Sequence, residues 1–123
     1  MIAYDTSTFA RALAGERDRA SRLLRQYLAT NEARMPPAVM TELLSNPALN
    51  EGSIRLIRMM PALELHDGYW ARAGALRRSV LALGLRGNLG DTLIAQSCID
   101  HDIPLITYDR DFRHFVPAGL KLA

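Results

Sequence analysis

Four acidic residues lie far apart along the chain, three at the ends of apolar segments and one inside a helical pattern: Asp5, Asp91 and Asp109, and Glu42. Carboxylates brought within several ångströms of one another repel, and one or two divalent cations are the usual compensation. Oxygen-only ligands favour Mg²⁺ or Mn²⁺. The chemistry available to carboxylate-held ions is to lower the pKa of a water molecule, orient it in line, and stabilise the leaving oxygen of a phosphodiester. The pattern therefore predicts a metal-dependent nuclease.

Each of these acids also has a purely structural interpretation. Asp91 is placed to cap its helix, although Ile94 stands where a capping box has Glu or Gln. Asp5 suits a turn, Asp109 suits an Asx-turn, and Glu42 suits a solvated helix face. Taken singly, each acid is as well explained by structure as by chemistry. Their coincidence favours a shared site.

Parallel strands would carry two of the acids to one edge of a sheet. The apolar strands expected at 2–5 and 104–109 each end on an acid. Ligands of open parallel sheets gather beyond the carboxyl ends of the strands. Asp91 opens the helix that precedes the later strand, and Glu42 lies in the helix that follows a short strand at 33–35. We therefore expect the four side chains to converge.

Helical patterns separate the expected strands. Strands are expected at 2–5, 33–35, 63–66 and 104–109, with 119–123 as a possible last one. Helices are expected from near Thr8 with Thr6 or Ser7 as cap, at 16–30, from Pro36-Pro37 to about Ser45, at 51–60, at 69–83, and from Asp91. In the helix at 69–83, the spacing places Tyr69, Ala73, Leu76, Val80 and Leu83 on the core-facing side. Strands alternating with helices predict an α/β fold with parallel strands covered on both faces.

Composition limits the other functional classes. A chain of 123 residues suffices for one compact domain with a hydrophobic core. No apolar run approaches the ~18 to 20 residues that cross a bilayer, and the N-terminus lacks the basic lead of a signal peptide, so a cytosolic protein is expected. Cys98, the single cysteine, is expected to be buried. The three histidines show no zinc-ligand spacing.

All 15 basic residues except Lys121 are arginine. Arginine binds phosphate bidentately and stacks on bases, which suits a nucleic-acid binder, while a GC-rich genome would explain the same bias. Arg86 and Arg110 lie near the acids in sequence. We expect them to contact phosphate, with surface ion pairs as the alternative. The arginines at 17–25 are assigned to a solvated helix face.

The sequence resembles the PIN-domain ribonucleases, specifically the VapC-type toxins of toxin–antitoxin pairs. The matching motifs are YDTS at 4–7, PAVMTELLS at 37–45, DTLIAQSCIDHDIPLIT at 91–107 and TYDRDF at 107–112. They cover nearly the whole chain. The resemblance implies one PIN-like domain over residues 1–123, with a three-layer α/β/α fold and a central, mainly parallel sheet of four to five strands.

The resemblance also implies roles for residues and partners. It implies an Mg²⁺- or Mn²⁺-dependent endoribonuclease whose catalytic acids are Asp5, Glu42, Asp91 and Asp109, with the first, third and fourth binding the metal. Ser7 would be a polar helper near the metal. Asp111 would share or replace the role of Asp109, because family members often carry Asn there and an acid before the Phe. Structured RNA such as tRNA, a homodimer, and a cognate antitoxin whose C-terminal segment lies across the acidic groove are also implied.

Three other functional interpretations of these acids are less well supported by the sequence. A phosphatase of the haloacid dehalogenase type needs an acid where this chain has Ser7, and a catalytic Lys where it has only Lys121. A Toprim domain would use Asp109 and Asp111, but it places Glu where this chain has Asp5. The non-enzymatic alternative is a degenerate PIN domain that binds protein or RNA without catalysis. The presence of all four acids argues against it.

Overall fold

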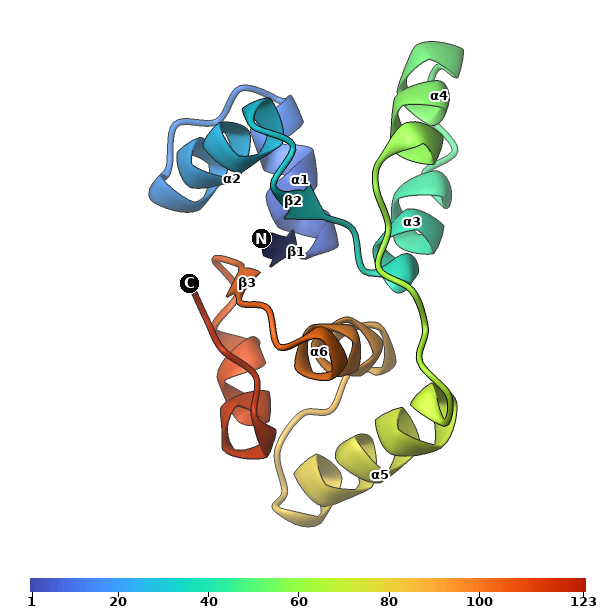
Figure 1. Ribbon diagram of the computed structural model, residues 1–123, viewed down its shortest axis with the longest axis vertical. Coiled ribbons are helices and arrows are strands. Elements are labelled where there is room, and N and C mark those ends of the chain that lie inside the picture. The colour runs from blue at the N-terminus through green and yellow to red at the C-terminus, as the bar shows by residue number, and fades with distance from the viewer.

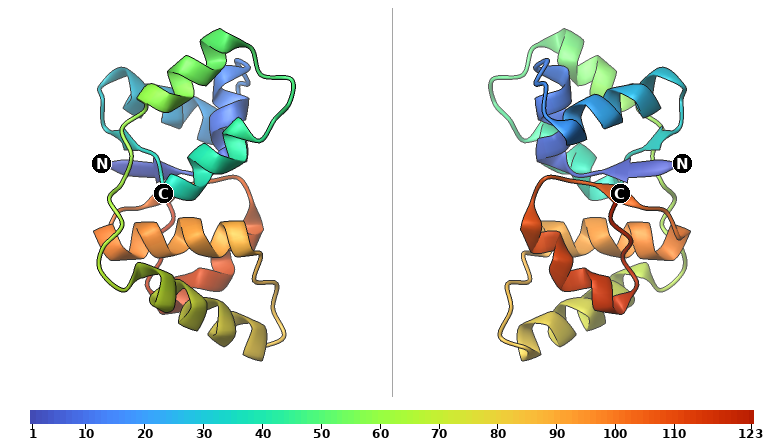
Figure 2. Two further views of the ribbon diagram at one scale, coloured as in Figure 1. Left: turned by 90° about the vertical axis from the view of Figure 1, so that its right-hand side faces the viewer. Right: turned by 90° about the vertical axis from the view of Figure 1, so that its left-hand side faces the viewer.

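The computed structural model describes residues 1–123 and has three layers (Figure 1). The strands are β1 (Ile2–Tyr4), β2 (Ala33–Arg34) and β3 (Leu105–Ile106). The helices are α1 (Thr6–Leu13), α2 (Arg19–Ala29), α3 (Pro37–Leu44), α4 (Glu51–Met59), α5 (Tyr69–Ala82), α6 (Leu89–His101) and the 3₁₀ helix η1 (Arg110–Ala118). Figure 2 shows α1 to α4 on one side of the sheet, with α5, α6 and η1 on the other. None of the helices is long and apolar enough to cross a membrane.

The sheet is parallel and has the order β2-β1-β3. Ala3, in the central strand, pairs with Arg34 on one side and with Leu105 on the other. Single parallel bridges extend the sheet at both edges, Met35 with Ala62 and Leu105 with Leu122. The predicted α/β/α fold is confirmed, and the predicted four to five strands correspond to three strands and these two bridges.

Several strands are shorter than the sequence predicts. The strand expected at 63–66 pairs only at its start, where Ala62 forms a bridge with Met35 and the Leu63 N–H donates to the Met35 carbonyl at 2.9 Å. Beyond this point the Glu64 carbonyl accepts a hydrogen bond from the His101 ring instead of from a neighbouring strand. The strand expected at 104–109 ends at Ile106. Beyond it, the Asp109 N–H donates to a side chain, Thr107 Oγ1, and the backbone turns into η1, a helix that no sequence pattern predicted.

One cluster of buried apolar residues joins the layers, and all of β1 lies inside it. Cys98 is buried in this cluster, as predicted. Of the five positions predicted to face the core from the helix at 69–83, the first four are buried. The prediction for Leu83 is wrong, because α5 ends at Ala82 and leaves Leu83 72% exposed.

Candidate functional site

The structure brings the four predicted acids to one place beyond the carboxyl end of β1. They line a hollow of about 300 Å³ together with four other residues, which are Thr6, Ser7, Ala10 and Ile94. We call this cavity the acidic hollow. Asp5 follows β1, Glu42 comes from α3, Asp91 lies in the first turn of α6, and Asp109 immediately precedes η1. The acidic hollow therefore lies where segments from both helical layers meet the carboxyl end of the sheet.

Asp5 is held rigidly because it caps α1. Its Oδ1 accepts the Thr8 N–H at 3.0 Å, and its Oδ2 accepts the hydroxyls of Thr107 at 2.9 Å and Ser7 at 3.4 Å. The helix thus begins at Thr6, earlier than predicted, and Asp5 is the cap in place of Thr6 or Ser7. An N-cap residue accepts, with its side-chain oxygen, a hydrogen bond from one of the first backbone N–H groups of the helix.

Burial affects the charge of Asp5. Only 4% of the residue is exposed. Burial raises the pKa of its carboxyl, the hydrogen bonds from Thr8 and Thr107 oppose that rise, and the negative charge of Asp109 adds to it. The carboxylate is therefore fixed in place while its charge is poorly solvated. A cation would relieve this condition.

Asp91 has its carboxylate free because another residue caps its helix. Asn88 is the N-cap of α6, and its Oδ1 accepts the Asp91 N–H at 3.2 Å. The interpretation of Asp91 as the cap is therefore wrong. Its carboxylate oxygens make no hydrogen bond in the structure. Burial raises the pKa of Asp91 to about 6, helped by the negative charges of the acids around it, in the order Asp109, Asp5, Glu42 and Asp111.

Glu42 is positioned by Thr6, which the sequence analysis considered only as a helix cap, and by Gly90, which it did not single out. Thr6 Oγ1 donates to Glu42 Oε1 at 2.6 Å. The other oxygen, Oε2, faces Gly90, where an added Cβ would lie only 2.9 Å away. Glycine in the first turn of α6 thus leaves room for a carboxylate from α3. The sequence analysis began this helix at Asp91, whereas α6 begins at Leu89, so Gly90 was not recognised as a helical glycine.

Asp109 both caps η1 and lines the acidic hollow. Its Oδ1 accepts the Asp111 N–H at 2.9 Å, which gives the expected Asx-turn, and its own N–H donates to Thr107 Oγ1 at 3.0 Å. Thr107 in turn donates to Asp5, so this unpredicted residue links two of the acids. Asp111 does not line the hollow, although its charge contributes to the raised pKa of Asp91.

The two arginines proposed as phosphate contacts are not part of the hollow. Arg86 and Arg110 are exposed, do not line it, and form no ion pair. Their alternative interpretation as paired surface charges is therefore not observed, and their role in phosphate binding stays a prediction. Neither they nor any other cation neutralises the four acids. The ion pairs of the structure all lie elsewhere: Arg11 with Asp18, Arg72 with Asp100, and Lys121 with Asp102.

The donor set of the hollow fits a hard divalent cation. It consists of carboxylates and hydroxyls, with uncompensated negative charge, and none of the histidines lines it. No three side chains of His, Cys, Asp or Glu are arranged around one point as they stand. Holding an ion therefore requires carboxylates to turn toward it. Asp91, whose oxygens make no hydrogen bond, is the freest of them to do so.

Comparison with known proteins places the chain in a family. The model of the PIN domain matches residues 2–116. No curated protein matches the sequence. Among solved structures, VapBC2 from Rickettsia felis, bound to a DNA fragment from its promoter, has a chain with 18% identity and a TM-score of 0.74; the match covers 100% of this chain and 98% of that one. FitAcB from Neisseria gonorrhoeae shows 17% identity and a TM-score of 0.72, with 99% and 96% covered.

At these identities the solved structures establish a shared fold. The family match extends over nearly the whole chain and over all four acids of the hollow. The chain therefore belongs to the PIN-domain family.

Proposed function

We propose that this protein is a metal-dependent endoribonuclease, the toxin component of a toxin–antitoxin pair of the VapC type. The observation that carries the proposal is the convergence of four carboxylates on one hollow without any cation of the protein beside them. Membership in the PIN-domain family supports it, since PIN domains are generally nucleases. Mg²⁺ or Mn²⁺ is the cofactor that suits these oxygen ligands.

The residues of the hollow would have different roles in catalysis. Asp5, Asp91 and Asp109 would hold the ion, which when bound would polarise the scissile phosphate and lower the pKa of the attacking water. Glu42 would accept the proton of that water at Oε2, because its Oε1 is already held by Thr6. Ser7 and Thr107 both donate to Asp5 and would keep its carboxylate in place. Asp111 supports the site through its charge and its backbone bond to Asp109.

The partners are proposed from likeness to other proteins. The chain shares its fold, over its whole length, with proteins of the VapBC2 and FitAcB assemblies. By this likeness we propose a cognate antitoxin. From the resemblance to VapC-type PIN domains we further propose that the C-terminal segment of this antitoxin lies across the acidic hollow, that the protein forms a homodimer, and that its substrate is structured RNA such as tRNA. Arg86 and Arg110 remain our proposed phosphate contacts outside the hollow.

The direct test is cleavage of RNA by the purified protein. With Mg²⁺ or Mn²⁺ we expect endonucleolytic products, and we expect a chelator and Asp5→Asn each to abolish them. Asp102→Asn is the matched control, because it is the same substitution at an exposed residue that follows the C-terminal end of α6, away from the acidic hollow. Unchanged cleavage by Asp5→Asn would overturn the assignment. Metal binding without any cleavage would favour the degenerate, non-catalytic PIN domain.

A further inference from the structure

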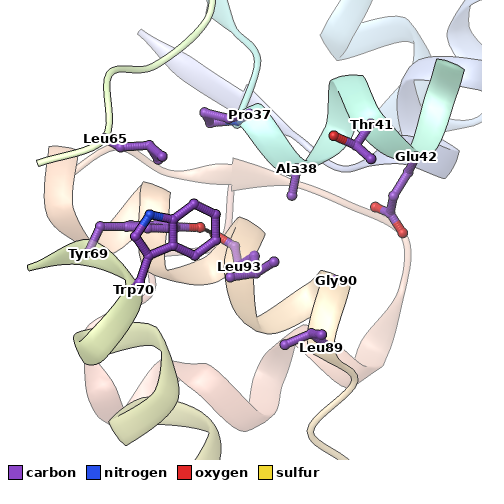
Figure 3. A pocket seen from close by; sticks show the side chains of 10 residues that line it. All are labelled: Pro37, Ala38, Thr41, Glu42, Leu65, Tyr69, Trp70, Leu89, Gly90 and Leu93. Atoms are coloured by element: carbon purple, nitrogen blue, oxygen red, sulfur yellow. Dashed lines mark hydrogen bonds between the residues drawn. The ribbon is translucent and has the colours of Figure 1, made fainter.

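An apolar groove opens beside the acidic hollow. It is a cavity of about 340 Å³ between α3, α6 and the start of α5, and we call it the Trp70 groove. Figure 3 shows Trp70 and Leu93 pointing into this space, with Glu42 at the opposite end from Trp70. Glu42 also lines the acidic hollow. A ligand in the groove would therefore be continuous with one at the four acids.

Trp70 is placed to present its ring to a ligand. It is the only tryptophan in the chain, and 67% of it is exposed. Tyr69 packs edge-on against it, with ring centroids 5.0 Å apart and an interplanar angle of 80°. The Tyr69 hydroxyl donates to the Leu93 carbonyl at 2.7 Å, which ties this aromatic pair to α6. An exposed but supported aromatic ring beside a catalytic site is characteristic of a stacking platform.

Positive charge lies next to the Trp70 groove. Leu89 lines both the Trp70 groove and a neighbouring hollow that contains Arg77 and Arg78. Arg77 Nε donates to the Gly87 carbonyl at 2.6 Å, so one edge of its guanidinium is fixed and the others remain for a ligand. The Trp70 groove thus shares Glu42 with the acidic hollow and Leu89 with the hollow that contains the arginines. A nucleic-acid strand offers the matching groups, because phosphates alternate with flat apolar bases along it.

We propose that the Trp70 groove binds an unpaired base that flanks the scissile phosphate, stacked on the indole ring of Trp70, while Arg77 and Arg78 bind a phosphate of the same strand. The proposal rests on the proposed ribonuclease function and specifies its substrate. A base within a duplex is stacked and paired and has no free face to offer this ring. Thr41, which also lines the groove, supplies a hydroxyl for the edge of the base. Cleavage would therefore occur at unpaired nucleotides.

Tryptophan fluorescence gives a test that needs no catalysis. Because Trp70 is the only tryptophan, a base stacked on it would quench the intrinsic tryptophan emission. Titrating the full-length protein in EDTA with single-stranded oligo(A) or oligo(U) should quench this emission saturably. The oligo(A)–oligo(U) duplex should not. Quenching by a peptide of the cognate antitoxin, with none by RNA, would assign the groove to a protein partner and overturn the proposal.

Variants then test the contribution of the ring. By anisotropy of labelled single-stranded RNA in EDTA, Trp70→Leu should weaken binding roughly 5- to 150-fold, the range expected for losing one stacked base. Trp70→Phe should retain most of the affinity. Met59→Ala is the control, because Met59 is 80% exposed and lies outside the groove. Thermal melting of each variant establishes that it is folded.

Cleavage assays separate the two proposals. With Mn²⁺ and single-stranded RNA, Trp70→Leu should raise KM by a similar factor and change kcat less, since stacking contributes to binding of both ground and transition states. If the wild type cleaves RNA while Trp70→Leu keeps its KM and the wild-type fluorescence is not quenched, the base pocket is overturned and the ribonuclease stands. If the wild type cleaves no RNA, the ribonuclease fails, and the titrations in EDTA still decide the groove.

Discussion

At the scale of single residues, structural and chemical roles coincide in the same side chains. Asp5 caps α1 with one oxygen and faces the acidic hollow, and Asp109 caps η1 in the same way. A cap fixes a carboxylate against the backbone, so a residue that begins a helix at a strand end is also well placed to bind a ligand. The two interpretations that the sequence left open are therefore compatible for these acids.

The neighbouring acids Asp109 and Asp111 should differ in their effect on activity. Asp109 lines the hollow, whereas Asp111 contributes its charge from outside it and its N–H to the turn. We expect Asp109→Asn to reduce kcat at least 100-fold, on the order of the effect of removing one group that stabilises charge in a transition state. Asp111→Asn should reduce it less than about 10-fold, measured on the same RNA. The reverse order would show that Asp111 is the fourth acid.

At the scale of elements, the site depends on where strands end and helices begin. β1 is the central strand, and its neighbours β2 and β3 lie on opposite sides of it. The connection from β1 to β2 passes through α1 and α2 on one face of the sheet, whereas the chain reaches β3 through α5 and α6 on the other face. This divergence leaves a crevice at the carboxyl ends of β1 and β3. Asp5 and Asp109 both follow strands that end at this crevice, and the first turn of α6 closes it. Strands of two or three residues are sufficient for this arrangement.

The first turn of α6 contains a glycine whose substitution should separate activity from stability. In Gly90→Ala the new methyl group would lie 2.9 Å from Glu42 Oε2 and displace that carboxylate. We expect kcat to fall about 10-fold or more, with the melting temperature nearly unchanged, since the gain in helix propensity of up to ~1 kcal/mol offsets the crowding.

Gly52 provides a closely matched control for this substitution. It is the second residue of α4, as Gly90 is of α6, and both helices have Asn caps. An added Cβ at Gly52 meets only the cap oxygen of Asn50, at 3.4 Å. Gly52→Ala should therefore leave kcat unchanged. Equal activity of the two alanine variants would contradict the proposed role of Gly90.

An ion pair ties α5 to α6 and should make stability depend on pH. Arg72 donates to both oxygens of Asp100, whose side chain is 8% exposed. Burial alone would raise the pKa of Asp100, but hydrogen bonds from Arg72 and Gln96 and the charge of Arg72 lower it overall. The folded-state pKa is thus below the ordinary value of 3.8. The stabilisation is present above that value and is lost as pH falls through the lower, folded-state pKa.

Asp100→Asn should consequently destabilise the protein at neutral pH. Because Arg72 is 42% exposed, we expect a loss of about 1 kcal/mol, well below that for a fully buried pair. Denaturant unfolding at pH 7 and pH 3 measures it, and the difference from wild type should shrink at the lower pH. Asp102→Asn, which breaks a more exposed pair with Lys121, should cost less than about 0.5 kcal/mol at either pH. A pH-independent loss in Asp100→Asn would contradict the electrostatic explanation.

At the scale of the whole molecule, the acidic hollow exists only in the folded chain. Its acids come from both helical layers and from the ends of two strands, and α3 and α6, which belong to opposite layers, contact each other beside it. A ligand that binds only this assembly must stabilise the fold by mass action. The same arrangement makes the empty cluster of like charges unfavourable in the absence of a cation.

Metal linkage should therefore be visible in thermal unfolding. Millimolar Mn²⁺ should raise the melting temperature of the wild type, by on the order of 10 °C if it exceeds Kd about 100-fold. Asp91→Asn removes one of the repelling charges, so it should melt above the wild type in EDTA and respond less to Mn²⁺. Asp102→Asn should behave as the wild type in both conditions. No shift of the wild type at millimolar Mn²⁺ would argue against a shared metal site.

The sequence predicted the elements better than their ends. The helical pattern at 69–83 located α5, yet it also assigned Leu83 to the core, because a periodic pattern does not reveal where the backbone stops following it. The strand expected at 63–66 failed for a different reason. Its Glu64 carbonyl bonds to His101, a residue far along the chain, and such competition is invisible locally.

Local chemistry determined much of this protein by itself. Isolated acids in or beside apolar segments, alternation of strands and helices, and motifs shared with PIN domains were sufficient to predict the fold class and the four acids of the hollow. Only the tertiary structure decided how these residues are held. Thr6, Thr107 and Gly90 act through contacts with residues that lie far from them in sequence. Hydrogen bonds and close approaches of this kind depend on distances in space, which the order of residues along the chain does not contain.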